Sequence, residues 1–225
     1  MKKTLILLCL IILGYCAWQA SLPRALRPQQ VARLEAAHNV DQLILVGVSE
    51  GSKALCSFYQ KEGGIWREIF TAQAYVGKNG LGKTREGDGK TPLGIFHFTK
   101  AFGIAPDPGC ALPYTQVDAT HYWVGDNASP LYNQFTSTTD GADFDLRESE
   151  HIIDYGQPYQ YCLNISYNED GKPGLGSAIF LHCYSHNTST AGCVAIPEEK
   201  MRELLRMVRP GCRIVIAALD TLANF

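Results

Sequence analysis

The sequence has no excess of charge of one sign and no long apolar run beyond its N-terminus. Its 20 lysines and arginines are balanced by 22 aspartates and glutamates, which gives a net charge of −2. Binding to nucleic acid or to an anionic membrane surface through charge requires a basic patch, so we expect no nucleic-acid partner. Internal repeats and linkers are missing as well. These absences exclude collagen, a coiled coil and a polytopic membrane protein.

Motifs for common cofactors and metals are also missing. The glycine-rich segment 76–92 contains no phosphate-binding GxxxxGK[ST] pattern. The cysteines form no CxxC pair and no Cys/His spacing typical of zinc. His97, His121 and His151 show no ligand spacing with one another. We therefore expect neither a metal nor a cofactor.

The N-terminus carries an export signal. Two lysines precede an apolar run from Leu5 to Trp18, a pattern typical of a secretory signal peptide. At about 15 residues this run is shorter than the roughly 20 of a membrane-spanning helix. Large residues stand where a cleavage site requires small ones, so an uncleaved membrane anchor stays open, and Cys16 leaves a lipid attachment open. We expect residues 1–20 to be a signal peptide or an N-terminal anchor of an exported protein.

The remaining residues predict a mainly β protein with one domain. Residues 21–40 form a short helical segment, and residues 41–220 form the domain, with residues 104–160 irregular. Apolar runs between glycine-containing turns predict strands at 43–48, 54–60, 65–75, 94–98, 160–167, 178–183 and 212–218. Pro197, followed by two glutamates and an apolar stripe, predicts the start of a helix.

Six cysteines follow the N-terminal segment: Cys56, Cys110, Cys162, Cys183, Cys193 and Cys212. In a secreted domain an even number of cysteines allows three disulfides. Six in about 200 residues are too sparse for a small disulfide scaffold. The count by itself leaves free thiols and disulfides equally open.

The residues from 177 to 197 carry the strongest chemical signal. An apolar strand ends at His182, and Gly192 and Cys193 lie just ahead of the predicted helix. A cysteine reacts as its thiolate, which a nearby imidazole and turn amides favour. Glycine permits a tight turn, and its amide can help to form an oxyanion hole. A structural cysteine beside a core histidine, or a disulfide between Cys183 and Cys193, fits the spacing equally well.

Four groups of motifs, in this order and spacing, resemble the YkuD-type L,D-transpeptidase catalytic domain over roughly residues 40–218. They are VGKNG at 76–80 with EGDGKTPLG at 86–94, SPLYN at 129–133, YN at 167–168 with GSAIFLH at 176–182, and TAGCVAIPE at 190–198. The resemblance implies a single β-sandwich-like catalytic domain with a helix after the catalytic cysteine. It also implies action on the stem peptides of peptidoglycan, in cell wall biogenesis and cell shape.

The resemblance also implies a role for each site residue. Cys193 is the nucleophile, and His182 is the base that activates it. The carbonyl group of Cys183 orients the imidazole, and the amides of Gly192 and Cys193 bind the oxyanion. The acyl-enzyme then passes to an amine, which forms a cross-link, or to water, which trims the peptide. We expect Cys193 to be a free thiol that a small electrophile alkylates first.

One departure from the commoner family pattern concerns the acceptor side, because Ala191 replaces the histidine of Ser/Thr-His-Gly-Cys. His186 lies in the same loop, where a solvated side chain is expected. We predict that Asp88 and Thr91 hold turn geometry. The predicted substrate-binding residues are Lys90, Tyr132, Asn133, Tyr167 and Asn168, and three further loop cations could face an acidic substrate: Lys78, Lys83 and Arg85.

These observations predict an exported cysteine acyltransferase that forms L,D cross-links between peptidoglycan stem peptides. The cell wall, the periplasm or the outer face of the cytoplasmic membrane is its expected location. The alternatives are an L,D-carboxypeptidase that trims stem tetrapeptides, or a non-catalytic, disulfide-stabilised cell-wall-binding module. A sortase-like enzyme would need an arginine such as Arg202, which falls inside the predicted helix. The sequence gives no indication of the oligomeric state.

Overall fold

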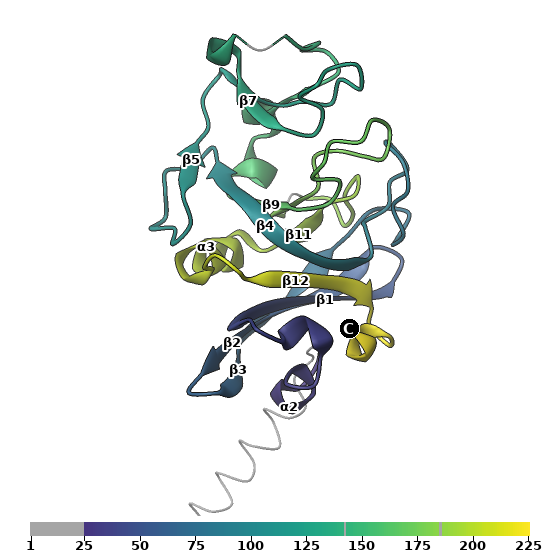
Figure 1. Cartoon of the computed structure of the whole chain (residues 1–225), viewed down its shortest axis with the longest axis vertical. Coiled ribbons are helices and arrows are strands. Elements are labelled where there is room, and N and C mark those ends of the chain that lie inside the picture. Colours follow the sequence, from purple (N-terminus) through teal and green to yellow (C-terminus); the bar gives the residue numbers. More distant parts are fainter. Residues whose placement is uncertain (1–24, 142, 185) are drawn as a thin grey trace, which may run out of the picture.

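The structure, a computed structural model, describes residues 25–141, 143–184 and 186–225. The predicted signal peptide or anchor, residues 1–20, lies outside this part. Among the described residues, no helix is both long enough and apolar enough to cross a membrane. The described chain forms one large sheet, one small sheet and a few short helices (Figure 1).

The large sheet closes on itself. Its strands lie in the order β12-β1-β2-β3-β11-β10-β9-β4-β5, and β4 also pairs with β12. The nine strands are β1 (Gln42–Glu50), β2 (Lys53–Glu62), β3 (Ile65–Tyr75), β4 (Gly94–Gly103), β5 (Tyr114–Gln116), β9 (Cys162–Ile165), β10 (Phe180–Cys183), β11 (Val194–Ile196) and β12 (Arg213–Ala218). The mainly β prediction is confirmed: the strand predicted at 65–75 is present with the same ends, and the other predicted strands are present with one or both ends shifted.

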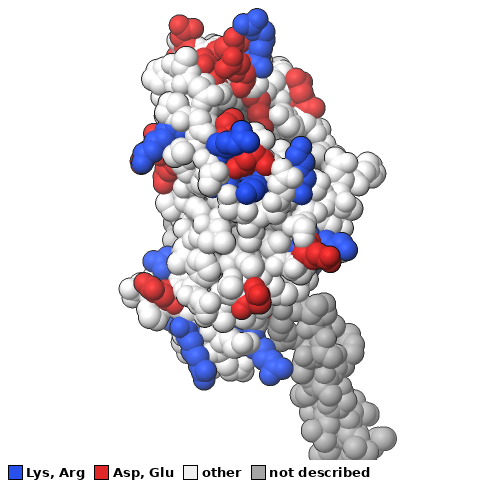
Figure 2. All heavy atoms as spheres, turned by 90° about the vertical axis from the view of Figure 1, so that its right-hand side faces the viewer, with Lys and Arg blue, Asp and Glu red and all other residues white. Residues whose placement is uncertain are grey.

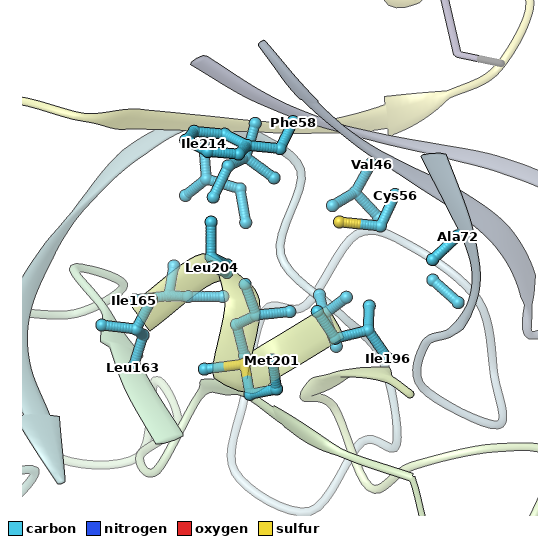
Figure 3. Close-up of a cluster of buried hydrophobic side chains, with 14 of the residues drawn as sticks. Val46, Cys56, Phe58, Ala72, Leu163, Ile165, Ile196, Met201, Leu204 and Ile214 are labelled. Atoms are coloured by element: carbon cyan, nitrogen blue, oxygen red, sulfur yellow. The ribbon is translucent and has the colours of Figure 1, made fainter. Parts of the chain in front are cut away.

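The helix predicted after the glycine-cysteine pair is α3 (Glu198–Met207). Its buried side chains are Met201, Leu204 and Leu205. Figure 3 shows Met201 and Leu204 among buried side chains of the surrounding strands. They belong to a cluster that includes Phe58 from β2 and Ile165 from β9. Because α3 follows β11 directly, this packing fixes the chain just after Cys193.

A short N-terminal segment covers the outer side of β1 and β12. It contains the α-helix α2 (Pro28–Val31) and the 3-10 helix η1 (Glu35–Ala37), separated by Leu34 in an extended conformation. Val31 and Leu34 pack with Leu43 and Val215 in a second cluster. The expected helical segment is therefore present but interrupted, and this cover explains why seven consecutive residues of β1 are buried.

Residues 104–160, expected to be irregular, contain most of a small sheet with the order β7-β6-β8. Its strands are β6 (His121–Trp123), β7 (Phe135–Ser137) and β8 (Glu150–His151), with the 3-10 helices η2 (Thr138–Asp140), η3 (Ile152–Tyr155) and η4 (Gln157–Tyr159); η5 (Leu222–Asn224) lies at the C-terminus. Strands of two or three residues are too short to show a period, so no sequence pattern predicts them. Trp123 joins the sheets through Phe180, with ring centroids 4.7 Å apart.

The packing of α3 yields a prediction for stability. Replacing Leu204 by alanine removes a fully buried side chain and should lower the free energy of unfolding by about 2–5 kcal/mol. Arg202→Ala, at an exposed position of the same helix, should change it by less than about 0.5 kcal/mol. Urea denaturation followed by circular dichroism measures both. Equal effects would show that α3 is not part of the core.

Candidate active site

His182 and Cys193 are brought together by two adjacent parallel strands. His182 lies near the end of β10, and Cys193 immediately precedes β11. The register pairs Leu181 with Val194 and His182 with Ala195, so His182 lies within this short ladder and Cys193 directly precedes it. Both line a pocket of about 450 Å³, together with residues of the small sheet and of the glycine-rich loop 76–92.

The imidazole of His182 is fixed in one orientation. Its Nδ1 lies 2.7 Å from the carbonyl oxygen of Cys183. Because a carbonyl oxygen only accepts hydrogen bonds, Nδ1 carries the proton and Nε2 is left as the basic nitrogen. The ring of Tyr159 packs edge-on against the imidazole, with centroids 5.5 Å apart. This arrangement suits His182 to remove a proton through Nε2.

The thiol of Cys193 is hydrogen-bonded to the backbone that leads into β10. Its Sγ accepts from the amide of Phe180 at 3.3 Å and donates to the carbonyl oxygen of Ala178 at 3.1 Å. The residue is buried, with only 7% of its surface exposed. In the free protein, therefore, the sulfur is sheltered on one side of the pocket.

Burial decides the protonation of both groups. It raises the pKa of Cys193 to about 12, and the charge of Glu150 adds to this increase. Burial also lowers the pKa of His182 to about 4. The resting pair is therefore a neutral thiol and a neutral imidazole. The thiolate favoured by the sequence motif does not form in the free protein, because desolvation outweighs the nearby amides and the opposing charge of Lys83.

The turn before Cys193 requires glycine. Gly192 has φ +157°, and a Cβ there would lie 2.9 Å from the carbonyl oxygen of Lys90. The Gly192 amide donates to Oγ1 of Thr190 at 3.1 Å, and that hydroxyl donates to the carbonyl oxygen of Cys193 at 2.7 Å. Thr91 Oγ1 donates to the same oxygen at 3.3 Å. The Gly192 amide, proposed for the oxyanion hole, thus already has a partner.

The glycine-rich loop brings a buried ion pair to this turn. Nζ of Lys83 lies 3.1 Å from Oδ1 of Asp88, and both side chains are almost fully buried. Although burial opposes it, hydrogen bonds from the amides of Thr84 and Lys90 and from Lys83 lower the pKa of Asp88. A Cβ at Gly176 would lie 2.3 Å from Cε of Lys83, so glycine makes room for the lysine. Asp88 holds the loop as expected.

The positively charged side chains that line the pocket differ from those expected. Lys78 and Lys83 line it, whereas Lys90 and Arg85 do not. Lys90 contributes its backbone, since its amide donates to Asp88 Oδ1 at 3.0 Å and its carbonyl group faces Gly192. The sequence placed all these lysines in one loop, but only the fold determines which of them points inward.

Four predicted substrate-binding residues, Tyr132, Asn133, Tyr167 and Asn168, are not among those that line the pocket. Asn133 Oδ1 accepts from Trp123 Nε1 at 2.9 Å and from the Ala178 amide at 3.0 Å. Its Nδ2 donates to the carbonyl oxygens of Tyr167 and Asn168 at 3.0 and 2.8 Å. The Asn133 side chain thus holds the segment that leads into β10, the strand that carries His182.

Tyr132 and Asn168 complete this network. The Tyr132 hydroxyl donates to Glu86 Oε2 at 2.6 Å. Nδ2 of Asn168 donates to the carbonyl oxygens of Lys172 and Gly176 at 3.0 and 2.9 Å. A buried polar group is costly unless it is paired, which explains why so many polar side chains lie together here.

Glu150 is a pocket residue that the sequence analysis missed. It lies on β8, is partly buried and accepts a hydrogen bond from the Tyr159 hydroxyl at 2.9 Å. Burial raises the pKa of Glu150 to about 7, and the charge of Glu86 contributes, while Tyr159 opposes the increase. No motif surrounds this glutamate, so only the packing of the small sheet against the large one reveals it.

The remaining candidates lie elsewhere. His186 is exposed and does not line the pocket. Arg202 does not line it either, so the sortase-like alternative has no support.

All six described cysteines are free thiols, which removes the support for a disulfide-stabilised module. No group of three potential metal ligands occurs in the described part of the chain. Positive and negative side chains are interspersed on the face shown in Figure 2.

Comparison with known proteins identifies the family. A profile described as the L,D-transpeptidase catalytic domain, YkuD, matches residues 41–216. The chain belongs to this family. The family match extends from β1 to within β12 and thus includes both His182 and Cys193. No curated protein sequence matches the chain.

Among solved structures, the chain is similar to Bd1075 from Bdellovibrio bacteriovorus at 17% identity and a TM-score of 0.42, over 79% of this chain and 48% of that one. It is similar to Pgp2 from Campylobacter jejuni, a helical cell shape determining protein, at 17% identity and a TM-score of 0.40, over 82% and 53%. An L,D-transpeptidase from Stackebrandtia nassauensis gives 13% identity and 0.37, over 84% and 63%. The chain thus spans about half the length of the first two.

Solvent access to the thiols of this L,D-transpeptidase-family domain yields a prediction. Cys110 is the only described cysteine that is partly exposed. Iodoacetamide at pH 7.5 should therefore alkylate Cys110 first, and Cys193 only slowly, which reverses the order expected from the sequence. Peptide mass mapping of the folded protein over time measures both rates, and labelling in urea provides the control. Faster labelling of Cys193 would show that its thiol is ionised in the free protein.

Glu150 yields a prediction for pH-dependent stability. An ordinary glutamate has a pKa of about 4.3, so between that value and about 7 the folded protein binds more protons than the unfolded chain. Stability from this group is therefore lost as the pH rises through that range. Glu150→Gln should be more stable than the wild type by about 1–3 kcal/mol at pH 8 and equally stable near pH 4.

Urea denaturation at both pH values measures this difference. Glu148→Gln, at an exposed position two residues away, is the matched control and should show no pH-dependent difference. A constant difference between Glu150→Gln and the wild type would mean that the Glu150 carboxyl group titrates normally.

Proposed function

We propose that this protein is an exported cysteine acyltransferase that acts on peptidoglycan stem peptides through an acyl-enzyme on Cys193 and forms L,D cross-links. One observation carries the proposal. In a domain of the L,D-transpeptidase family, a thiol and an oriented imidazole open into the same pocket. A cysteine paired with a histidine base is the arrangement that acyl transfer requires.

The neutral resting pair defines how the first step proceeds. As Sγ of Cys193 attacks the donor carbonyl carbon, Nε2 of His182 takes the thiol proton. His182 then gives this proton to the departing amine, which leaves the acyl group on sulfur. Because the pKa of His182 is about 4, its imidazolium form gives up a proton to the departing amine more readily than an ordinary imidazolium does. His182 thus acts as base and then as acid within one turnover.

The same turn supplies groups that can stabilise the oxyanion. We propose the amide of Cys193 for this role, as the family resemblance implies. The Gly192 amide contributes only if it exchanges Thr190 Oγ1 for the substrate oxygen. Lys83 supports the developing negative charge, because its ammonium group already lowers the pKa of Cys193.

Export and anchoring belong to this proposal. Peptidoglycan lies outside the cytoplasmic membrane, and the sequence predicts that residues 1–20 direct the chain there. We propose that the segment is either cleaved as a signal peptide or retained as an anchor. Roles in cell wall biogenesis and cell shape follow from the same substrate.

Incubation with a disaccharide tetrapeptide tests the function. Mass spectrometry should detect dimers that have lost one terminal D-amino acid, together with an acyl adduct on Cys193. Cys193→Ala should abolish both, and His182→Gln should slow adduct formation by about 10²–10⁴-fold. Arg202→Ala is the control and should retain full activity.

The products also separate the alternatives. Tripeptide without dimer at every acceptor concentration would mean that the protein is an L,D-carboxypeptidase. If the wild type forms no adduct and no product, the catalytic proposal is wrong.

A further inference from the structure

The acyl-transfer steps above leave one ionisable side chain of the pocket without a role. Glu150 projects from β8 into the pocket that contains Cys193 and His182. Glu150 and Cys193 line the same pocket, and the charge of the carboxylate raises the pKa of the thiol. A group that makes the nucleophile harder to ionise opposes the first step, which suggests that it serves a different one.

The position of Glu150 is fixed relative to His182 by two tyrosines. The Tyr159 hydroxyl group donates a hydrogen bond to Glu150, and the Tyr159 ring packs against the imidazole of His182. Tyr155 stacks on Tyr159 with centroids 4.3 Å apart and also hydrogen-bonds Glu150. The carboxyl group and the catalytic base are therefore held on the same wall of the pocket.

Glu150 has no positively charged partner among the described residues. The buried Lys83 of the pocket is paired with Asp88. The other pocket carboxyl group, Glu86, is bonded through both oxygens, because Oε2 accepts from Tyr132 at 2.6 Å and from Ser177 at 2.7 Å, and Oε1 accepts from the Gly87 amide at 3.2 Å. A partly buried carboxyl group without a cation is a binding site for a cationic ligand.

The second half of the proposed reaction brings such a cation. An aliphatic amine is an ammonium ion at neutral pH and has no lone pair until it loses a proton. Nε2 of His182 has to carry the proton that returns to Sγ of Cys193, so a second group is needed to accept the proton that the ammonium ion loses first. Ala191, on the acceptor side of the site, has no ionisable side chain. Among the described pocket residues, Glu150 is the proton acceptor whose hydrogen-bond partners are tyrosine hydroxyl groups of the same pocket wall.

We infer that Glu150 binds the ammonium group of the acyl acceptor and takes up the proton that this group must lose before it attacks. The inference rests on the proposed acyl-transfer function and names the residue that selects an amine over water. The contact is between the carboxylate and the ammonium ion, so any aliphatic primary amine of suitable shape qualifies.

The step balances as follows. The ammonium ion gives one proton to Glu150, and the free nitrogen forms a C–N bond with the acyl carbon. Collapse of the tetrahedral intermediate breaks the C–S bond. The second proton on nitrogen passes through Nε2 of His182 to Sγ of Cys193, and Glu150 releases its proton to solvent. The products are the amide, the free thiol and one proton.

The surroundings of Glu150 suit this exchange. Its pKa of about 7 means that the carboxylate is available near neutral pH and still accepts a proton readily. The titratable groups that act on it are Tyr155, Tyr159, Glu86 and Cys193. The adjacent His151 instead bonds Asp154 and the Ala119 carbonyl group, and its ring stacks on Tyr122.

The test compares acceptors that differ in charge, using the full chain with Glu150→Gln and the exposed control Glu148→Gln. A tetrapeptide donor forms the Cys193 adduct, which is then offered water, an aliphatic primary amine or hydroxylamine, a nucleophile that is neutral at pH 7. Glu150→Gln should reduce transfer to the aliphatic amine by about 10–100-fold. Adduct formation should be no slower than in the wild type, because the variant removes a charge that opposes it, and hydrolysis and transfer to hydroxylamine should stay within about twofold.

Other outcomes overturn the inference. Equal losses with the aliphatic amine and hydroxylamine would mean that Glu150 supports the pocket structurally. Slower adduct formation with a donor that carries a side-chain amine, but not with a donor that lacks one, would mean that the carboxylate recognises the donor. A wild-type adduct that never passes to any amine would overturn the acceptor role alone, whereas absence of a wild-type adduct would overturn the acyl-transfer function itself.

Discussion

The parallel pairing of β10 with β11 is the constraint on which the rest of the site depends. Parallel neighbours cannot be joined by a tight hairpin, so the chain must leave the sheet after Cys183 and return before Val194. That excursion is the loop that ends in the glycine-cysteine turn. The sheet on one side and α3 on the other then hold both ends of the loop, which keeps Cys193 in the pocket that His182 also lines.

The same burial that makes the arrangement rigid keeps both groups neutral. Removing water disfavours the charged forms of both the thiol and the imidazole. For Cys193 this effect outweighs the favourable charge of the nearby Lys83. In the proposed reaction, such a site keeps the thiol protonated until the sulfur attacks a bound acyl group. The fixed Nδ1–H of His182 makes this possible, because it leaves Nε2 as the single basic nitrogen.

Much of the polar chemistry around the pocket is structural. Asn133 uses both ends of its amide group to connect the small sheet with the segment that precedes β10. Its motif neighbours bond backbone carbonyl groups or Glu86 in the same way. Residues that form part of a family motif can therefore act by shaping the site, and their presence in the sequence does not distinguish this role from substrate binding.

The sequence by itself determined the features that reside in contiguous residues. Apolar runs predicted the strands of the large sheet, and Pro197 with its acidic first turn predicted α3. The strand ending at His182 and the Gly192–Cys193 turn pointed to the pair of residues that we propose to be catalytic. Such signals are local, because each depends on neighbours along the chain.

Only the tertiary structure decided which distant groups meet at that pair. Glu150 reaches the pocket because the small sheet packs against Phe180, and Lys83 rather than Lys90 points inward because Gly176 leaves space for it. Tertiary burial also set the protonation of Cys193 and His182. These outcomes depend on contacts between residues far apart in the chain and on how much water they exclude, which no local pattern specifies.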